Sequence, residues 1–185
     1  MNKHFIFTSG RSGSNYLSNT LNISNECVNY GEVLGEWTVP YKWIYKNFFK
    51  NKEIEEYLDF IYSNGAFFYM GQIYSCLSRF KNGRKIKFKV KGAVESIGIK
   101  DFAITMGRRE GTFQYISNHP EIKIIYLYRA NILNRYISLV FMGENNQAVS
   151  YQQIKNNKLH IDIDDLIDKM NVFDLMFVCI VFSKG

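Results

Sequence analysis

The sequence predicts an α/β protein, a three-layer sandwich with a central parallel sheet and helices on both faces. Two stretches, 5–21 and 122–142, each run from an apolar strand through a polar loop into an amphipathic helix. Strands that are apolar along their whole length are typical of parallel sheets, because both of their faces are buried. A third strand is expected between these two stretches, over Lys85–Val90.

The first stretch, 5–21, contains a loop rich in glycine and serine. The apolar run 5–7 leads into Thr8–Ser14, and an amphipathic segment follows from Asn15 to Leu21. N–H groups at a helix start, together with the helix dipole, favour an anion there. Five loop residues suit this purpose, two glycines that let the backbone approach and three hydrogen-bonding side chains: Gly10, Gly13, Arg11, Ser12 and Ser14. We expect a phosphate or sulfate group at this loop; a purely structural turn is the alternative.

The second stretch, 122–142, has an arginine directly after its strand. Residues Ile122–Tyr128 are mostly β-branched or aromatic, and Arg129 follows them directly. The helix expected over Asn131–Met142 has an apolar row and a polar face that includes Ser138. Open α/β sheets bind ligands at the carboxyl ends of their strands, which makes Arg129 a candidate. The alternative is an arginine that faces solvent and a serine without a role.

The loop does not match the common nucleotide fingerprints. It lacks the GxxxxGK[ST] spacing, and GxGxxG is absent as well. It resembles the 5′-phosphosulfate-binding loop of sulfotransferases that use 3′-phosphoadenosine-5′-phosphosulfate (PAPS). The run Arg11–Leu17 is most similar to the bacterial carbohydrate sulfotransferases. With two further motifs the resemblance extends from residue 5 to residue 138, and it implies the P-loop-nucleotide-kinase-like fold of sulfotransferases.

The resemblance also implies a role for each motif. The cofactor-binding residues would be those of the loop and two residues of the second stretch, which would hold the 3′-phosphate: Arg11, Ser12, Gly13, Ser14, Asn15, Arg129 and Ser138. Glu32, in Tyr30-Gly31-Glu32, would be the general base that takes the proton of the acceptor hydroxyl. Arg11 would also be catalytic, because it neutralises charge on the bridging oxygen. Glu36 is a competing base, and the third possibility is that neither carboxylate acts.

The implied reaction moves a sulfuryl group from PAPS to an acceptor hydroxyl on a carbohydrate or small metabolite, without a metal. Lys89 or Lys91, at the end of the expected middle strand, could also touch the sulfonate. A small-molecule kinase is one alternative. It is disfavoured by the missing Lys-Ser/Thr pair and by the absence of a clear second acidic strand end for magnesium. An inactive or fragmentary nucleotide-binding protein is the other alternative.

A helical insert is expected over about residues 40–82. Asn51 can cap a helix with one apolar face: Ile54, Tyr57, Leu58 and Ile61. A second helix is expected over Ala66–Phe80, also with one apolar face: Phe67, Met70, Tyr74 and Leu77. The aromatic residues from Trp37 to Phe49 are expected in the core; a platform for a sugar or another flat acceptor is the alternative.

The composition agrees with a single domain over residues 1–185. A net charge of +6 suits a polyanionic cofactor, and an RNA-binding patch around 81–91 is a minor alternative. Cys27, Cys76 and Cys179 have no spacing suited to a disulfide framework or a metal site, which favours a reducing compartment. We expect a cytoplasmic protein without a membrane span that acts on a small-molecule or carbohydrate acceptor and not on nucleic acid; both a monomer and a homo-oligomer fit the sequence.

The end of the chain carries a long apolar run. Asp162 can cap a helix that includes Ile163, and residues 175–182 are apolar throughout. An element that is apolar all round must be covered on every side. We therefore expect a C-terminally truncated form, or a partner chain that covers this element.

Overall fold

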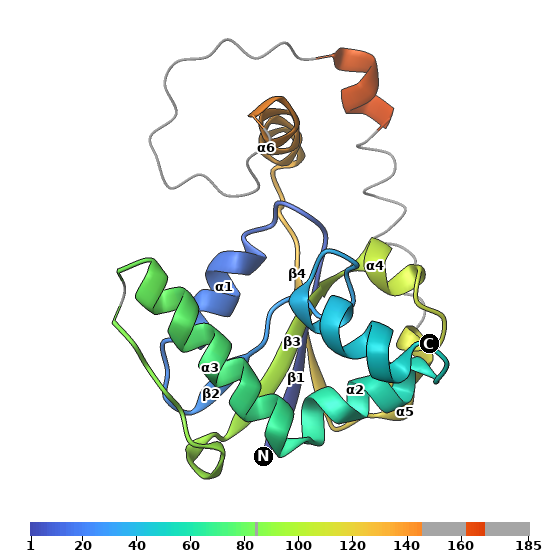
Figure 1. The fold of residues 1–185 in the computed structure, drawn as a ribbon. Coiled ribbons are helices and arrows are strands. Elements are labelled where there is room, and N and C mark those ends of the chain that lie inside the picture. Colours follow the sequence, from blue (N-terminus) through green and yellow to red (C-terminus); the bar gives the residue numbers. More distant parts are fainter. Residues whose placement is uncertain (84, 146–161, 169–185) are drawn as a thin grey trace. The chain divides into compact units, whose positions relative to one another are not determined.

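The computed structural model describes residues 1–83, 85–145 and 162–168, which belong to two compact units, Met1–Leu127 and Tyr128–Gly185. The first unit contains a parallel sheet with the strand order β2-β3-β1-β4 (Figure 1). Its strands are β1 (Asn2–Thr8), β2 (Cys27–Asn29), β3 (Ser96–Phe102) and β4 (Ile122–Leu127). The predicted α/β class is therefore confirmed, as are the strands predicted over the apolar run 5–7 and over Ile122–Tyr128, although β4 ends one residue earlier, at Leu127.

The helices of the first unit alternate with these strands. They are α1 (Ser14–Leu21), the π-helical η1 (Tyr41–Phe49), α2 (Ile54–Ser63), α3 (Gly65–Lys81), the 3₁₀-helical η2 (Lys91–Ala93), α4 (Ala103–Gly107) and α5 (Thr112–Asn118). The second unit contains α6 (Ile132–Asn145), and residues 163–168 are also helical.

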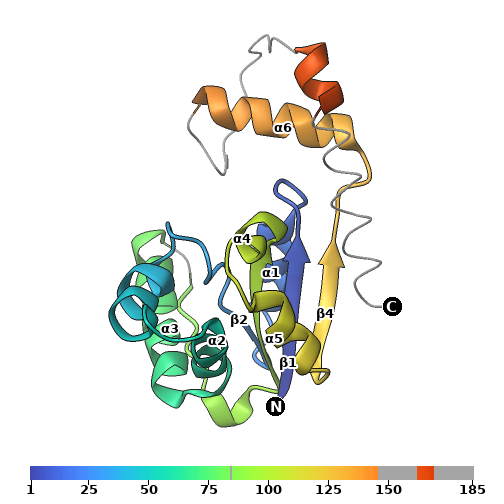
Figure 2. The same cartoon turned by 90° about the vertical axis from the view of Figure 1, so that its right-hand side faces the viewer.

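Helices cover both faces of the sheet. Successive side chains of a strand point to opposite faces, so Phe7 and His4 of β1 lie on different sides. The Phe7 ring lies beside Phe113 of α5, with 6.2 Å between the ring centroids. On the other face, His4 is hydrogen-bonded to Asn29, whose Oδ1 accepts a bond from Ser18 of α1. Figure 2 shows β1 and β4 side by side and parallel.

The prediction of a strand over Lys85–Val90 is wrong. The strand between β1 and β2 is β3, and residues 85–90 form no regular strand. Ile86 and Phe88 in this segment are exposed, whereas Lys89 is buried. A strand in the middle of a parallel sheet is buried on both faces, which a row of alternating lysines cannot provide. The apolar start of β3, with Ile97 and Ile99 fully buried, meets that requirement.

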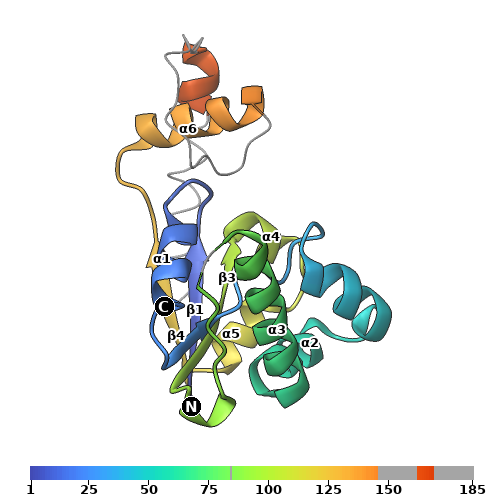
Figure 3. The same cartoon turned by 60° about the vertical axis from the view of Figure 1, so that its left-hand side comes forward.

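The predicted helical insert is present, but only one of its two predicted apolar faces is buried. The predicted face of α2 is buried in full. On α3, Phe67 is buried, while three other predicted residues are exposed: Met70, Tyr74 and Leu77. The inward side of α3 is rotated from the predicted one, because it carries Phe67, Phe68 and Gln72, which are buried, and Gly71, which lies against Tyr30. Figure 3 shows α2 and α3 next to one another.

The second unit confirms two predicted helix starts. The Asn131 side chain accepts a hydrogen bond from the backbone three residues later, at the start of α6. Asp162 caps the helix at 163–168, since its Oδ1 accepts the N–H groups of Asp164 and Asp165. The apolar run at 175–182 lies outside the described residues.

Candidate functional site

The loop predicted to bind an anion follows the central strand. β1 lies between β3 and β4, and two connections leave the carboxyl ends of the strands in opposite directions, from β1 through α1 to β2 and from β3 through α4 and α5 to β4. Such a point, at the carboxyl ends of parallel strands, is where open α/β sheets bind ligands. The hydroxyls of Thr8 and Ser12 form a short hydrogen bond across the loop, and α1 begins directly after Gly13.

Two loop residues adopt the left-handed backbone conformation. Gly13 has a φ of 89°, and Arg11 has a φ of 63°. Glycine adopts this region freely, but a side chain there costs about 1–3 kcal/mol. Arg11 is the one residue other than glycine with a positive φ in the described part of the chain. Strain of this kind collects at ligand sites, so it supports a binding role for the loop.

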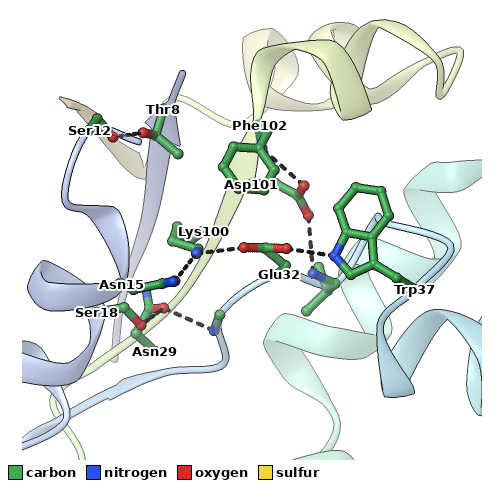
Figure 4. A network of polar contacts seen from close by, with 12 residues as sticks. Thr8, Ser12, Asn15, Ser18, Asn29, Glu32, Trp37, Lys100, Asp101 and Phe102 are labelled. Atoms are coloured by element: carbon green, nitrogen blue, oxygen red, sulfur yellow. Dashed lines mark hydrogen bonds and ion pairs between the residues drawn. The ribbon is translucent and has the colours of Figure 1, made fainter. Parts of the chain in front are cut away.

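A buried lysine joins the loop region to the candidate base (Figure 4). The Lys100 ammonium donates hydrogen bonds to Asn15 Oδ1, at the start of α1, and to Glu32 Oε1 at 2.7 Å. The side chains of Lys100 and Glu32 are 2% and 18% exposed. The other Glu32 oxygen, Oε2, accepts the indole N–H of Trp37 at 2.8 Å. Two residues predicted separately, Asn15 and Glu32, therefore meet through a third that was not predicted.

The residue after Lys100 anchors the segment that follows Glu32. Asp101 is fully buried, and its Oδ2 accepts the backbone N–H groups of Val33 and Leu34 at 3.1 and 2.8 Å. Burial raises the pKa of Asp101 to about 6, although its backbone hydrogen bonds act in the opposite direction. The expectation that no second strand has a clear acidic end did not include Asp101, which lies next to the last residue of β3. A Lys-Asp pair that closes an apolar run was the available sequence signal.

The competing base, Glu36, lies in a different environment. Its side chain is 70% exposed, and its Oε1 accepts a hydrogen bond from Arg109 at 3.0 Å. The guanidinium of Arg109 in turn lies over the Tyr41 ring, 4.3 Å from its centroid. This surface pair is separate from the contacts that join Glu32 to Asn15, which favours Glu32 over Glu36.

Lys89 and Lys91 form hydrogen bonds near the opposite end of the sheet. The Lys89 ammonium donates to the backbone oxygens of Asn22 and Cys27, and Cys27 begins β2. Lys91, which precedes β3, donates to the Ser63 carbonyl at 2.7 Å. The amino ends of parallel strands lie opposite the anion loop, so neither lysine is a candidate for the sulfonate.

The two residues predicted to hold a 3′-phosphate belong to the second unit. Arg129 is exposed and lies two residues beyond the end of β4. Ser138 is half-buried on α6. Their joint role stays a prediction.

Within residues 1–83, 85–145 and 162–168, no group of three metal-binding side chains could hold an ion. The helices described are all too short or too polar to cross a membrane. No protein-family model matches the chain, and no curated protein or solved structure matches it either. What the site can do is therefore inferred from its own residues.

Proposed function

We propose that the protein is a PAPS-dependent sulfotransferase that acts on an acceptor hydroxyl of a carbohydrate or small metabolite. The contact of Lys100 with both Asn15 and Glu32 carries this proposal. It sets a carboxylate beside the start of α1, where the anion loop ends. An acceptor hydroxyl bound there would meet both a base and the sulfuryl group.

The loop would hold and activate the donor. Sulfuryl transfer, like phosphoryl transfer, is expected to pass through a loose in-line transition state, so that positioning and charge stabilisation dominate. The acceptor oxygen forms a bond to sulfur while the bond from sulfur to the bridging oxygen breaks, and 3′,5′-adenosine bisphosphate leaves. Arg11 and the N–H groups at the start of α1 would neutralise the charge that grows on the bridging oxygen and the 5′-phosphate.

Glu32 would receive the acceptor proton. A sugar hydroxyl is a poor nucleophile until a base removes its proton, and such a base contributes about a hundred- to ten-thousand-fold in rate. Hydrogen bonds from Lys100 and Trp37 hold the two oxygens of this carboxylate in place. Arg129 and Ser138 would bind the 3′-phosphate and so distinguish PAPS from ATP.

The topology agrees with this proposal. A loop after the central strand of a parallel sheet, followed by a helix, is the arrangement that the P-loop-nucleotide-kinase-like fold of sulfotransferases would require.

A small-molecule kinase is the second candidate, and Asp101 favours it. A carboxylate at the end of a strand next to β1 is well placed for a magnesium ion in a nucleotide-binding protein. However, its two oxygens already accept three backbone N–H groups, from Val33, Leu34 and Phe102. The loop also lacks the lysine that would reach a γ-phosphate.

Thermal unfolding with different nucleotides tests the choice between the two candidates. We expect 3′,5′-adenosine bisphosphate to stabilise the protein by about 2.7 kcal/mol at a hundred times its dissociation constant. AMP should stabilise it far less, because AMP has no 3′-phosphate. Equal effects of AMP and the bisphosphate would contradict the proposed 3′-phosphate site. Stabilisation by ATP that requires magnesium would favour the kinase.

The base is tested by a matched pair of variants. Glu32→Gln keeps an oxygen for Lys100, so we expect it to fold and to bind the bisphosphate. Its transfer rate should fall by about a hundredfold or more. Glu36→Gln removes an equivalent carboxylate from the surface pair with Arg109 and should retain the rate. Wild-type turnover in Glu32→Gln would show that another residue is the base.

A further inference from the structure

Trp37 is hydrogen-bonded to the candidate base, Glu32, but its side chain is exposed. Its indole N–H donates to Glu32 Oε2 at 2.8 Å, and the residue is nevertheless 55% exposed. A large aromatic side chain at the surface is normally free to change rotamer. Here the hydrogen bond to a carboxylate that Lys100 also holds restricts it (Figure 4).

Two further contacts restrict the indole. A Cβ atom at Gly35 would lie 2.6 Å from the Cε2 and Cζ2 atoms of Trp37, closer than any side chain could come. Glycine at this position therefore lets the ring pack against the backbone. The Phe102 ring, at the end of β3, has its centroid 6.5 Å from that of Trp37. The indole is thus supported by Gly35, Phe102 and Glu32, and its remaining surface is available to a ligand.

The surroundings of the indole are polar. Glu32, Lys100 and Asn15 form a hydrogen-bonded group at its N–H edge. An exposed indole beside the carboxylate of Glu32 and the amide of Asn15 suits a ligand that is apolar on one face and carries hydroxyls around its edge. A pyranose ring has this character. A flat aromatic acceptor would gain more from a closed apolar slot.

We propose that Trp37 is the platform on which the sugar ring of the acceptor stacks, and that its hydrogen bond to Glu32 sets the distance from that ring to the base. This proposal rests on the proposed function only for the identity of Glu32 as the base. The stacking itself requires neither donor nor turnover. It can therefore fail while the sulfotransferase proposal stands, and the converse also holds.

The two tryptophans of the chain allow a direct test. Trp43→Phe leaves Trp37 as the sole tryptophan, and Trp37→Phe leaves Trp43, which is 71% exposed in η1. Each variant is titrated with methyl glycosides of the common hexoses, with cellobiose and with phenol, without any nucleotide. We expect at least one glycoside to change the fluorescence of the Trp43→Phe protein, and none to change that of the Trp37→Phe protein.

Affinity supplies the second measurement. Loss of the stacking contact in Trp37→Ala should weaken binding of the same glycoside by about tenfold. Ligand-observed NMR measures this affinity. Trp43→Ala should leave it unchanged. The proposal is overturned if no glycoside changes the fluorescence of Trp37, if phenol does so and the glycosides do not, or if Trp37→Ala binds the sugar as tightly as Trp43→Ala.

Discussion

Lys100 and Glu32 form an ion pair whose ammonium is almost completely buried. Removing one partner of a buried pair leaves the other charge with poorer compensation, which is generally costly. We expect Lys100→Met and Glu32→Gln to be non-additive, with an interaction free energy of about 1–3 kcal/mol. Urea unfolding of the two single variants and the double variant measures it. Additive effects would show that the charge of Glu32 adds nothing to stability through its contact with Lys100.

His4 and Asp101 are two buried groups with opposite effects on the pH dependence of stability. Burial lowers the pKa of His4 from 6.5 to about 4, and it raises the pKa of Asp101 from 3.8 to about 6. Between pH about 4 and 6.5, His4 is protonated in the unfolded chain but not in the folded protein. Between pH 3.8 and about 6, Asp101 is protonated in the folded protein but not in the unfolded chain. As pH rises through these windows, His4 makes the free energy of unfolding increase and Asp101 makes it decrease.

Single substitutions should reveal the two opposed contributions. Compared with the wild type, Asp101→Asn should gain stability more steeply as pH rises from about 4 to about 6.5, because only the His4 contribution remains. His4→Gln should show the opposite trend. Urea unfolding at several pH values measures both slopes. Wild-type slopes in both variants would show that neither group is buried as described.

At the scale of the element, α3 is the clearest test of which helix face is buried. Phe68 is fully buried, whereas Leu77 is exposed. We expect Phe68→Ala to lower the free energy of unfolding by about 3–5 kcal/mol. Leu77→Lys should change it by no more than about 0.5 kcal/mol. A large loss from Leu77→Lys would mean that the face predicted from the sequence is covered after all.

At the scale of the whole molecule, net charge and the predicted role of Arg129 bear on cofactor binding. The net charge of +6 should favour a polyanionic ligand, with an affinity that falls as salt rises. Arg129→Ala should weaken binding of 3′,5′-adenosine bisphosphate by about 1.5–3 kcal/mol. Calorimetric titration at constant salt measures this loss.

Lys123→Ala is the matched control, since it removes the same charge from an exposed position on β4. It should alter the affinity little, and AMP should bind both variants alike. If Arg129→Ala and Lys123→Ala bind the bisphosphate equally well, Arg129 does not contact the 3′-phosphate.

Local sequence patterns predicted much of the fold. An apolar run, a loop of small residues and a helical period depend on neighbours along the chain. This is why β1, α1, β4 and the buried face of α2 were predicted. The middle strand was misplaced because the alternating lysines of 85–90 satisfy the local pattern of a half-buried strand. The middle of a parallel sheet requires burial on both faces, as in β3.

The sequence by itself determined the α/β class and the loop with its glycine, serine and arginine residues, and the resemblance singled out Glu32. Only the tertiary structure decided which residues surround that carboxylate. Lys100 is 68 positions from Glu32 and 85 from Asn15, so no pattern along the chain relates them. They meet because parallel strands bring their carboxyl ends to one edge of the sheet, where residues far apart in the chain become neighbours.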